Sequence, residues 1–372
     1  MTFVSVKTAS FRNLENAEIS VGGKDIFLVG ENGQGKTNFL EALYFISYGS
    51  SFRGVRDGEL IRSGEKNCSV SVKLEGSAYS GISAIYRDGK KNITLDGKRI
   101  EDRKELLNVA PCIVFCHEDM EFVAGSPEER RWFFDQTLSL PDPLYLDDLR
   151  NYRRVLKARN NVLKNEYDSH SPGISAEGRA LLDALDPQLV RYGFEVMKKR
   201  KNEAENFSRI LEPLYAEISG VDGISIGYIP SWKTGDIDAA LSDIGRRREH
   251  DRSFGMSLSG PHRDRYAFSR KNGARMAEFS GKASTGQRRL LALLLRIAQA
   301  RVFSEKTGKN PVLLLDDVLL ELDGEKRKKF LALMPGYEQA FYTFLPEEPY
   351  NLYRKDDTIV YSVSSGTLKW LT

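Results

Sequence analysis

The chain has 372 residues with 41% hydrophobic content, which is ample for a large buried core and for about two domains. The net charge is only +3, which argues against a uniformly polybasic nucleic-acid binder, so any DNA contact must come from local patches. No apolar run approaches the roughly 18 residues of a membrane span. No signal peptide is visible and only three cysteines occur, so we expect a cytoplasmic protein without a membrane partner.

The first hundred residues predict a sheet with one early helix. Short apolar runs alternate with turns, as in "DIFLVG", "CSVSVKLEG" and "SGISAIYRDGKKNITLDGKRI". The Asp-Gly pairs in "RDGK" and "LDGK" are typical of tight turns between strands. The early helix is expected from Asn38 to about Tyr48.

Helical periodicity predominates from Pro127 to about Gly220. Pro187 is expected to start or kink a helix and Pro213 to limit it, so a helix between them would be roughly 40 Å long. We expect a projecting helical arm over residues 127–220, inserted between head segments 1–126 and 221–372. Apolar residues recur at helical spacing in two stripes: Leu149, Tyr152, Leu156 and Leu163, then Leu182, Leu185, Leu189, Tyr192 and Val196.

Strand signals return after the arm, at "GISIGYIP" and "FGMSLSGPHRDRYAF". A long apolar helix is predicted at about Gln287 to Phe303. The strand "PVLLLDD" follows it and, after another helix, so does "QAFYTFL". The whole pattern predicts the α/β class, with mixed sheets and helices in a head that carries the helical arm.

The most specific local motif is a phosphate-binding loop. The segment "GENGQGKT" fits G-x-x-x-x-G-K-[ST] and follows a predicted strand from Asp25 to Val29. Glycines let successive backbone N–H groups turn toward one point, and the next helix adds its positive N-terminal end. We expect Lys36 to reach the β- and γ-phosphates and Thr37 to ligate Mg²⁺; the alternative is a glycine-rich turn with a surface lysine. The remaining residues of the expected nucleotide site are Gly30, Glu31, Asn32, Gly33, Gln34 and Gly35.

The segment "VLLLDD" supplies the carboxylates that a Mg²⁺ site requires. Val312 to Leu315 are continuously apolar, as in a strand that is covered on both faces. Asp316 is then placed to hold Mg²⁺ through water, and Asp317 to orient or deprotonate an attacking water. About 270 residues separate this motif from Thr37, so a large insertion must lie within one nucleotide-binding core.

A second candidate anion site lies upstream of that strand. Ser284, Gly286 and Gln287, in "STGQ", open the long apolar helix, whose N-terminus favours negative charge. In ABC-type ATPases a signature of this form contacts the γ-phosphate bound to the other subunit, so that two heads enclose ATP. The signature and the later strand together indicate an ABC-type P-loop ATPase head that forms an ATP-dependent homodimer.

With these motifs the chain resembles the RecF family of bacterial recombination-repair ATPases, which is related to SMC and Rad50 heads. The resemblance covers nearly the whole chain and rests on "FRNLENAEI", "GENGQGKTNFLEAL", "SFRGVRDGELIRSG", "VFCHEDMEFVAGSPEERRWFFD", "LSGPHRD", "ASTGQRRLLALLL" and "LLLDDVLLELD". It implies ATP and Mg²⁺ as cofactors and DNA gaps or ssDNA–dsDNA junctions as the ligand. It further implies RecR and RecO as partners in loading the RecA recombinase, and a nucleoid-associated location.

Three positions depart from the family pattern. Arg288 stands where a second Gln is usual after Gly-Gln, and Leu320 where a Ser is expected before Glu-Leu-Asp. Arg265 stands where an acid is usual. Because the first two lie near the expected dimer contact, they bear on its fine geometry.

Several basic residues have both a functional and an ordinary interpretation. Arg53, Arg56 and Arg62 follow the first helix, and either contact phosphate of nucleotide or DNA or form a solvated basic face. The runs 198–201 and 246–248 are candidate DNA contacts, although charge runs are usually solvated surface.

Four polar positions outside the main motifs also have specific predictions. Ser126 and Glu129 predict a capping box at the start of a helix. Asp323 resembles the D-loop aspartate of ABC ATPases and equally fits a helix N-cap. Thr343 occupies the place where many ABC ATPases carry a switch histidine; a strand-end threonine without a catalytic role is the alternative.

The function predicted from the sequence is slow, DNA-stimulated ATP hydrolysis that times the dimer on DNA. A transporter ATPase subunit is one alternative, but it predicts a compact core without a helical arm. A non-catalytic DNA clamp is another, but it does not explain the intact Lys36, Thr37, Asp316 and Asp317.

Overall fold

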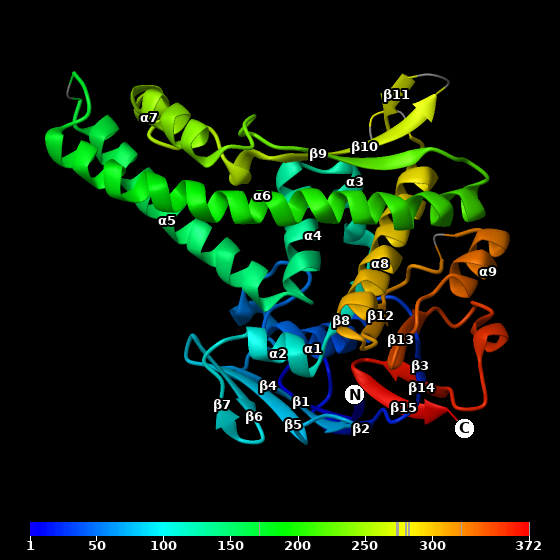
Figure 1. The fold of residues 1–372 in the computed structure, drawn as a ribbon. Helices are drawn as coiled ribbons and strands as arrows, with labels where there is room; N and C mark the ends of the chain where they lie inside the picture. The colour runs from blue at the N-terminus through cyan, green and yellow to red at the C-terminus, as the bar shows by residue number, and fades with distance from the viewer. Residues whose placement is uncertain (171, 273–274, 280, 282, 321, 372) are drawn as a thin grey trace. The chain divides into compact units, whose positions relative to one another are not determined.

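The computed structural model describes residues 1–170, 172–272, 275–279, 281, 283–320 and 322–371 (Figure 1). The chain forms two compact units, one made of Met1–Met120 with Thr285–Thr372 and the other of Glu121–Ser284. Both ends of the chain belong to the first unit, so the second unit is an insertion, as the distance between the two nucleotide motifs predicts.

The first unit contains a six-stranded sheet in the order β15-β14-β3-β13-β12-β8. All neighbouring strands are parallel except β14 and β15, which form an antiparallel hairpin. The predicted strands "DIFLV", "VLLL" and "QAFYTF" are confirmed as β3, β12 and β13, and they are buried throughout, as strands of a covered parallel sheet must be. The strand bounds are β3 Asp25–Val29, β8 Cys112–Phe115, β12 Val312–Leu315, β13 Gln339–Phe344, β14 Ile359–Ser364 and β15 Thr367–Leu371.

A second six-stranded sheet of this unit has the order β2-β1-β4-β5-β6-β7 and is antiparallel. Asp88 and Asp96 have positive φ angles of 50° and 47° in the turns that follow β5 and β6. These angles are those of the tight Asp-Gly turns that the sequence predicts. The strand bounds are β1 Thr2–Ala9, β2 Ala17–Ser20, β4 Asn67–Glu75, β5 Gly81–Arg87, β6 Lys90–Leu95 and β7 Lys98–Arg99.

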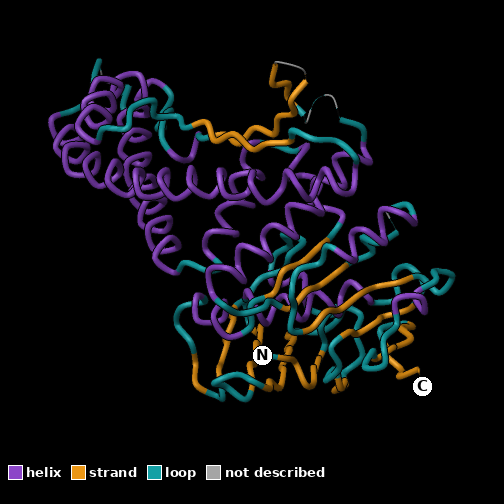
Figure 2. Tube along the Cα trace, turned by 45° about the vertical axis from the view of Figure 1, so that its right-hand side comes forward, coloured by secondary structure: helices purple, strands orange, loops and turns teal. Residues whose placement is uncertain are grey.

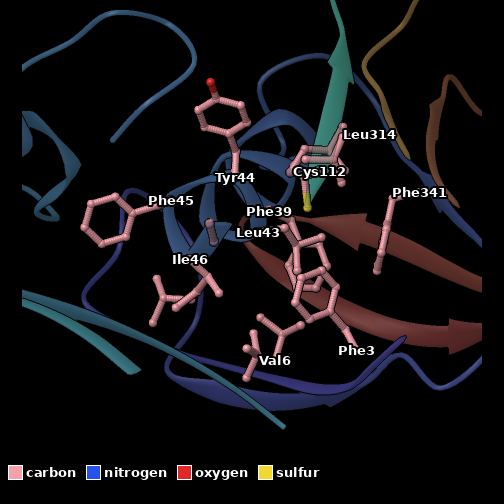
Figure 3. Packing of buried hydrophobic residues seen from close by; sticks show 14 of the residues in the cluster. Phe3, Val6, Phe39, Leu43, Tyr44, Phe45, Ile46, Cys112, Leu314 and Phe341 are labelled. Atoms are coloured by element: carbon pink, nitrogen blue, oxygen red, sulfur yellow. The ribbon is translucent and has the colours of Figure 1, made fainter. Parts of the chain in front are cut away.

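Helix α1, Lys36–Tyr48, packs between the two sheets and starts two residues before the predicted Asn38. Figure 3 shows its apolar side chains directed into the core of the unit. The ring of Phe341 on β13 lies 6.4 Å from the rings of both Phe3 on β1 and Phe39 on α1, so one cluster joins both sheets to the helix. The other helices of the unit are α2 Lys104–Val109, α8 Thr285–Thr307 and α9 Gly324–Ala332, with 3₁₀ turns η1 Asp57–Leu60, η2 His117–Met120 and η4 Tyr350–Tyr353.

The second unit combines helices with a three-stranded antiparallel sheet in the order β11-β10-β9. The segment after Gly220 belongs to this unit, because strand β9 packs on helix α6 (Figure 2) and helix α7 packs on both α5 and α6. The predicted arm, 127–220, is therefore shorter than the compact unit. Its elements are α3 Glu121–Ala124, α4 Pro127–Ser139, α5 Pro143–Asp168, α6 Ala176–Ser219, β9 Ile224–Ile229, α7 Ile237–Ser253, η3 Pro261–Arg263, β10 Arg265–Asn272 and β11 Arg275–Glu278.

The expectations that the long helix starts at Pro187 or is limited by Pro213 are wrong, while a kink at Pro187 stays a prediction. Helix α6 has 44 residues, begins after the N-cap Ser175, and continues through Pro187 and Pro213 to Gly220. At 1.5 Å per residue it is about 66 Å long, not roughly 40 Å. Each interior proline costs about 3 kcal/mol. We attribute the continuity to the packing of the apolar face of α6 on α5, β9 and α7. The segment 254–264 also differs from its prediction, since only Arg265–Asn272 forms the strand β10.

Two buried arginines hold the second unit together. Arg200 on α6 donates from Nε to Asp135 Oδ1 at 2.9 Å and contacts Asp264 Oδ2 at 3.3 Å from Nη1. Arg159 on α5 donates to Asp186 and Asp251, each at 2.7 Å. Because removal of one partner from a buried ion pair is strongly destabilising, these bonds fix the arrangement of α4, α5, α6 and α7.

The half-buried His262 makes the stability of the second unit depend on pH. Its Nε2 lies 3.0 Å from the carbonyl oxygen of Ser257, which can only accept, so Nδ1 accepts from the Tyr152 hydroxyl at 2.7 Å. Burial lowers the pKa of His262 to about 4, against an ordinary value of 6.5. The unfolded chain therefore takes up a proton as pH falls through 6.5, while the folded chain resists protonation until about pH 4.

We expect wild-type protein to lose about 2 kcal/mol more unfolding free energy than His262→Gln when the pH is lowered from 7.5 to 5. The measurement is urea unfolding at both pH values, followed by the fluorescence of the buried Trp232 in the same unit. His170→Gln removes an exposed histidine of this unit and serves as the control. Equal pH dependence of wild type and His262→Gln would contradict the expectation.

Candidate active site

Three neighbouring strands of the parallel sheet end side by side, and the residues of the candidate site lie at these ends. Strand β13 lies between β3 and β12, and it is parallel to both. The phosphate-loop motif follows β3, Thr343 lies near the end of β13, and Asp316 follows β12. The carboxyl ends of parallel strands meet at one edge of a sheet, which is where open α/β sheets bind ligands.

The loop between β3 and α1 has the backbone of a phosphate cradle. Gly35 has a φ of 114°, a conformation that favours glycine, and serves as the N-cap of α1. Lys36 is buried, and its Nζ donates to the carbonyl oxygens of Gly30 at 2.6 Å and Glu31 at 3.2 Å. A pocket of about 270 Å³ is lined by Glu31, Asn32, Gly33, Gly35, Lys36, Thr37, Asn38, Arg53 and Asp317.

Gln34, which the sequence predicts to be part of the nucleotide site, bonds to another segment of the chain. Its side-chain Oε1 accepts from the backbone N–H of Ser365 at 2.6 Å, and its carbonyl oxygen accepts from Gly366 at 2.8 Å. Both partners lie in the turn between β14 and β15. Among the predicted loop residues, neither Gly30 nor Gln34 is one of those that line the pocket.

The two halves of the predicted Mg²⁺ site are in direct contact. The hydroxyl of Thr37 donates to Asp316 Oδ1 at 2.8 Å, although 279 positions separate the two residues in the sequence. Burial raises the pKa of Asp316 to about 6; the Thr37 hydrogen bond opposes this rise, and the nearby Asp317 carboxylate adds to it. A hydroxyl and a carboxylate are hard oxygen ligands, which suit an ion that is held by few protein groups together with substrate phosphates.

Asp317 lines the pocket and is oriented by Thr343. Its backbone N–H donates to Thr343 Oγ1 at 2.7 Å, and the Thr343 hydroxyl donates to Asp317 Oδ1 at 2.6 Å. Asp317 has a positive φ of 54°, which is uncommon for a non-glycine residue and directs the side chain after β12. Thr343 is thus a strand-end residue that positions the carboxylate, a function that the sequence left open.

Asn38, which the sequence did not assign to the site, and Arg53, whose role it left open, both line the pocket. Arg53 Nη1 donates to Asn38 Oδ1 at 3.1 Å and lies 3.9 Å from the carboxylate of Glu41. The fully buried Glu41 accepts from Arg12 Nε at 2.8 Å and from Ser51 at 2.5 Å. Arg53 lines the pocket and also has these protein partners, so its contact with phosphate stays a prediction. No single motif marks Asn38 in the sequence.

The signature segment opens a helix, as predicted. Helix α8 begins at Thr285; Ser284 and Gly286 are exposed, and Gln287 is half-buried. Within the first unit, none of residues 285–287 is among those that line the pocket. The body of α8 is held by Arg296, whose Nη2 lies 2.7 Å from the buried Asp119 of "CHED".

The other singled-out residues have structural partners. Ser126 and Glu129 form the predicted capping box of α4, and Asp323 is the N-cap of α9. Arg62 donates to Asn16 at 3.0 Å, while Arg56 is the N-cap residue of η1.

The basic runs are partly engaged within the fold. Arg200, in the run 198–201, is buried, which contradicts a purely solvated face. Arg248 pairs with Asp183 and Asp186, whereas Arg246 and Arg247 are more exposed and pair with Asp243.

The comparisons with known proteins agree with this geometry. The model of the "RecF/RecN/SMC N terminal domain" family matches residues 3–355. The DNA replication and repair protein RecF of Treponema pallidum (strain Nichols) is 42% identical over 359 residues, which cover 96% of this chain and 98% of that protein. The chain belongs to the RecF family.

A further relative and two solved structures are also similar to this chain. RecF of Bacillus subtilis (strain 168) is 33% identical and covers 92% of this chain and 93% of its own length. The solved structure of the recombination mediator protein RecF with ATP, in the RecFOR pathway, superposes with a TM-score of 0.87 at 26% identity, covering 100% of this chain and 97% of that one. An Smc head domain of Pyrococcus furiosus, with a TM-score of 0.56 at 18% identity and coverage of 99% and 95%, shares the fold alone. The ABC-type ATPase head that the sequence predicts is therefore confirmed.

Proposed function

We propose that the chain is an ATP-dependent DNA-binding repair protein that dimerises on ATP. It would bind gaps or ssDNA–dsDNA junctions and help RecR and RecO to load the RecA recombinase, at the nucleoid in the cytoplasm. The observation that carries the proposal is the 2.8 Å bond from Thr37 to Asp316, which brings two distant nucleotide motifs together in a RecF-family chain. The RecF relatives are named for DNA replication and repair, and one solved neighbour is an ATP complex.

The residues of the site divide the chemistry between them. Lys36 would bind the β- and γ-phosphates, and Asp317, held by Thr343, would orient the attacking water and accept its proton. Thr37 and Asp316 would hold Mg²⁺, which when bound neutralises charge on the phosphate oxygens. Arg53 and Asn38 would line the phosphate end of the pocket.

Dimerisation would complete the site from a second copy. Ser284, Gly286 and Gln287, at the start of helix α8, would contact the γ-phosphate that is bound in another head. No helix in the described part of the chain has the length and apolar character needed to cross a bilayer.

The experiment that tests the proposal is ATP hydrolysis with and without gapped duplex DNA. We expect DNA to stimulate a slow basal turnover, and ATP to tighten DNA binding. DNA affinity should fall steeply with salt, since phosphate-backbone contacts release counterions. A hydrolysis rate that is the same with and without DNA, together with a DNA affinity that depends on neither ATP nor salt, would contradict the proposal.

A signature variant provides the second arm of this experiment. Ser284→Arg should bind ATP as a monomer but fail to dimerise, because a bulky side chain would enter the phosphate site of the second copy. Size-exclusion chromatography with ATP measures this directly. A dimer peak like that of wild type would mean that Ser284 only begins helix α8.

A further inference from the structure

The turn between β14 and β15 lies against the phosphate-binding loop. Two backbone N–H groups of this turn donate to one loop residue: that of Ser365 to Gln34 Oε1 at 2.6 Å, and that of Gly366 to the Gln34 carbonyl oxygen at 2.8 Å. These residues are more than 300 positions apart in the sequence. The contact joins the C-terminal hairpin to the segment that precedes helix α1.

A second segment holds the loop from the N-terminal side. Asn13, in "FRNLENAEI", donates from Nδ2 to the Gly33 carbonyl oxygen at 3.3 Å and accepts at Oδ1 from Asn38 at 2.7 Å. The backbone N–H of Glu15 donates to the Gly366 carbonyl oxygen at 2.9 Å. The hairpin turn and the Asn13 segment are therefore bonded both to the loop and to each other.

A side chain at Gly366 would collide with backbone, and one at Gly35 would press on the Asn13 side chain. A Cβ on Gly35 would lie 3.0 Å from Asn13 Oδ1 and 3.4 Å from Gly366 Cα. A Cβ on Gly366 would overlap the carbonyl oxygen of Asn13. Gly366 also has a φ of 82°, in the left-handed region. The turn thus packs tightly against the Asn13 segment and is hydrogen-bonded to the loop.

We propose that Asn13, Ser365 and Gly366 are positioning residues for nucleotide binding, because they fix the backbone of Gly33–Gly35 in the shape that directs its N–H groups at phosphate. A preorganised loop binds without the cost of ordering on contact with the ligand. Loosening this clamp therefore weakens nucleotide affinity without removing any group that touches the nucleotide. The inference rests on the proposed ATP binding and extends it to the far C-terminal hairpin.

The chain offers a matched control for the decisive variant. Gly89 occupies the position in the β5–β6 turn that Gly366 occupies in the β14–β15 turn. Gly89 has a φ of 72° and follows Asp88, whose φ is 50°; Gly366 follows Ser365, whose φ is 49°. A Cβ on Gly89 would meet nothing within 4 Å. Gly366→Ala and Gly89→Ala therefore share the strain of a positive φ, and only the first disturbs the loop.

The test is MgATP affinity by calorimetry, with hydrogen exchange of the amides of residues 33–37. We expect Gly366→Ala to bind MgATP roughly tenfold more weakly, as for the loss of one or two hydrogen bonds, and to exchange these amides faster. Gly89→Ala should match wild type in both measurements. Equal affinity of the two variants would overturn the proposal.

A second variant protects the test against misfolding of Gly366→Ala. Gln34→Ala removes only the half-buried side chain that accepts from Ser365, and it should also weaken MgATP binding and speed exchange of the loop amides. Wild-type affinity in Gln34→Ala would count against the clamp. Failure of the wild-type chain itself to bind MgATP would instead overturn the proposed function.

Discussion

Lys36→Ala should lose tight ATP binding and, with it, ATP-driven dimerisation. In the folded chain the Lys36 ammonium is buried and points into the loop, where it bonds to the carbonyl oxygens of Gly30 and Glu31. It would exchange these neutral acceptors for the β- and γ-phosphates. Hydrogen bonds between charged groups contribute roughly 1.5–3 kcal/mol each, so losing two predicts at least about 100-fold weaker binding.

Calorimetric titration with MgATP measures this effect, and Lys66→Ala, which removes an exposed lysine of the same unit, is the control. The variant should remain folded, because the ammonium is expensive to bury and the alanine continues helix α1. Normal affinity in Lys36→Ala would count decisively against the phosphate-binding assignment of the loop.

The parts of the site that the sequence predicts are those built from local pattern. The glycines of residues 30–35 predict a loop after a strand, and the apolar run before Asp316 predicts a second strand. Both strands, β3 and β12, were confirmed. Their meeting at Thr37 and Asp316 follows once both strands belong to one parallel sheet.

Contacts between distant segments were not predictable in the same way. Gln34 reads as a loop residue of the nucleotide site, yet its side chain bonds to Ser365, which no spacing rule connects to it. Arg200 sits in a run of cations that suggests surface, but its buried partners Asp135 and Asp264 come from other segments. Pro187 marks a helix boundary by local propensity, and the packing of α6 overrides that preference.

Asp317→Asn should bind ATP and dimerise normally but hydrolyse it slowly. The substitution keeps the shape of the side chain, and its amide oxygen can still accept from the Thr343 hydroxyl, which lies 2.6 Å from Asp317 Oδ1. The amide cannot accept a proton from the attacking water. Removal of a general base predicts a loss of roughly 10²-fold or more in turnover. DNA should also remain bound longer, because in the proposed function hydrolysis would separate the two heads.

A variant with a longer acidic side chain at position 317 is the control for this prediction. Many ABC ATPases have Glu at this position, and Asp is one methylene shorter, so we expect the wild-type chain to hydrolyse slowly, as suits a timer more than a motor. Asp317→Glu restores the longer base and should retain turnover, whereas Asp317→Asn should not. Single-turnover hydrolysis, measured beside DNA dissociation, separates the two variants. If the Asn variant hydrolyses ATP at the wild-type rate, another group positions the water, and the bond from Thr343 serves only to shape the loop after β12.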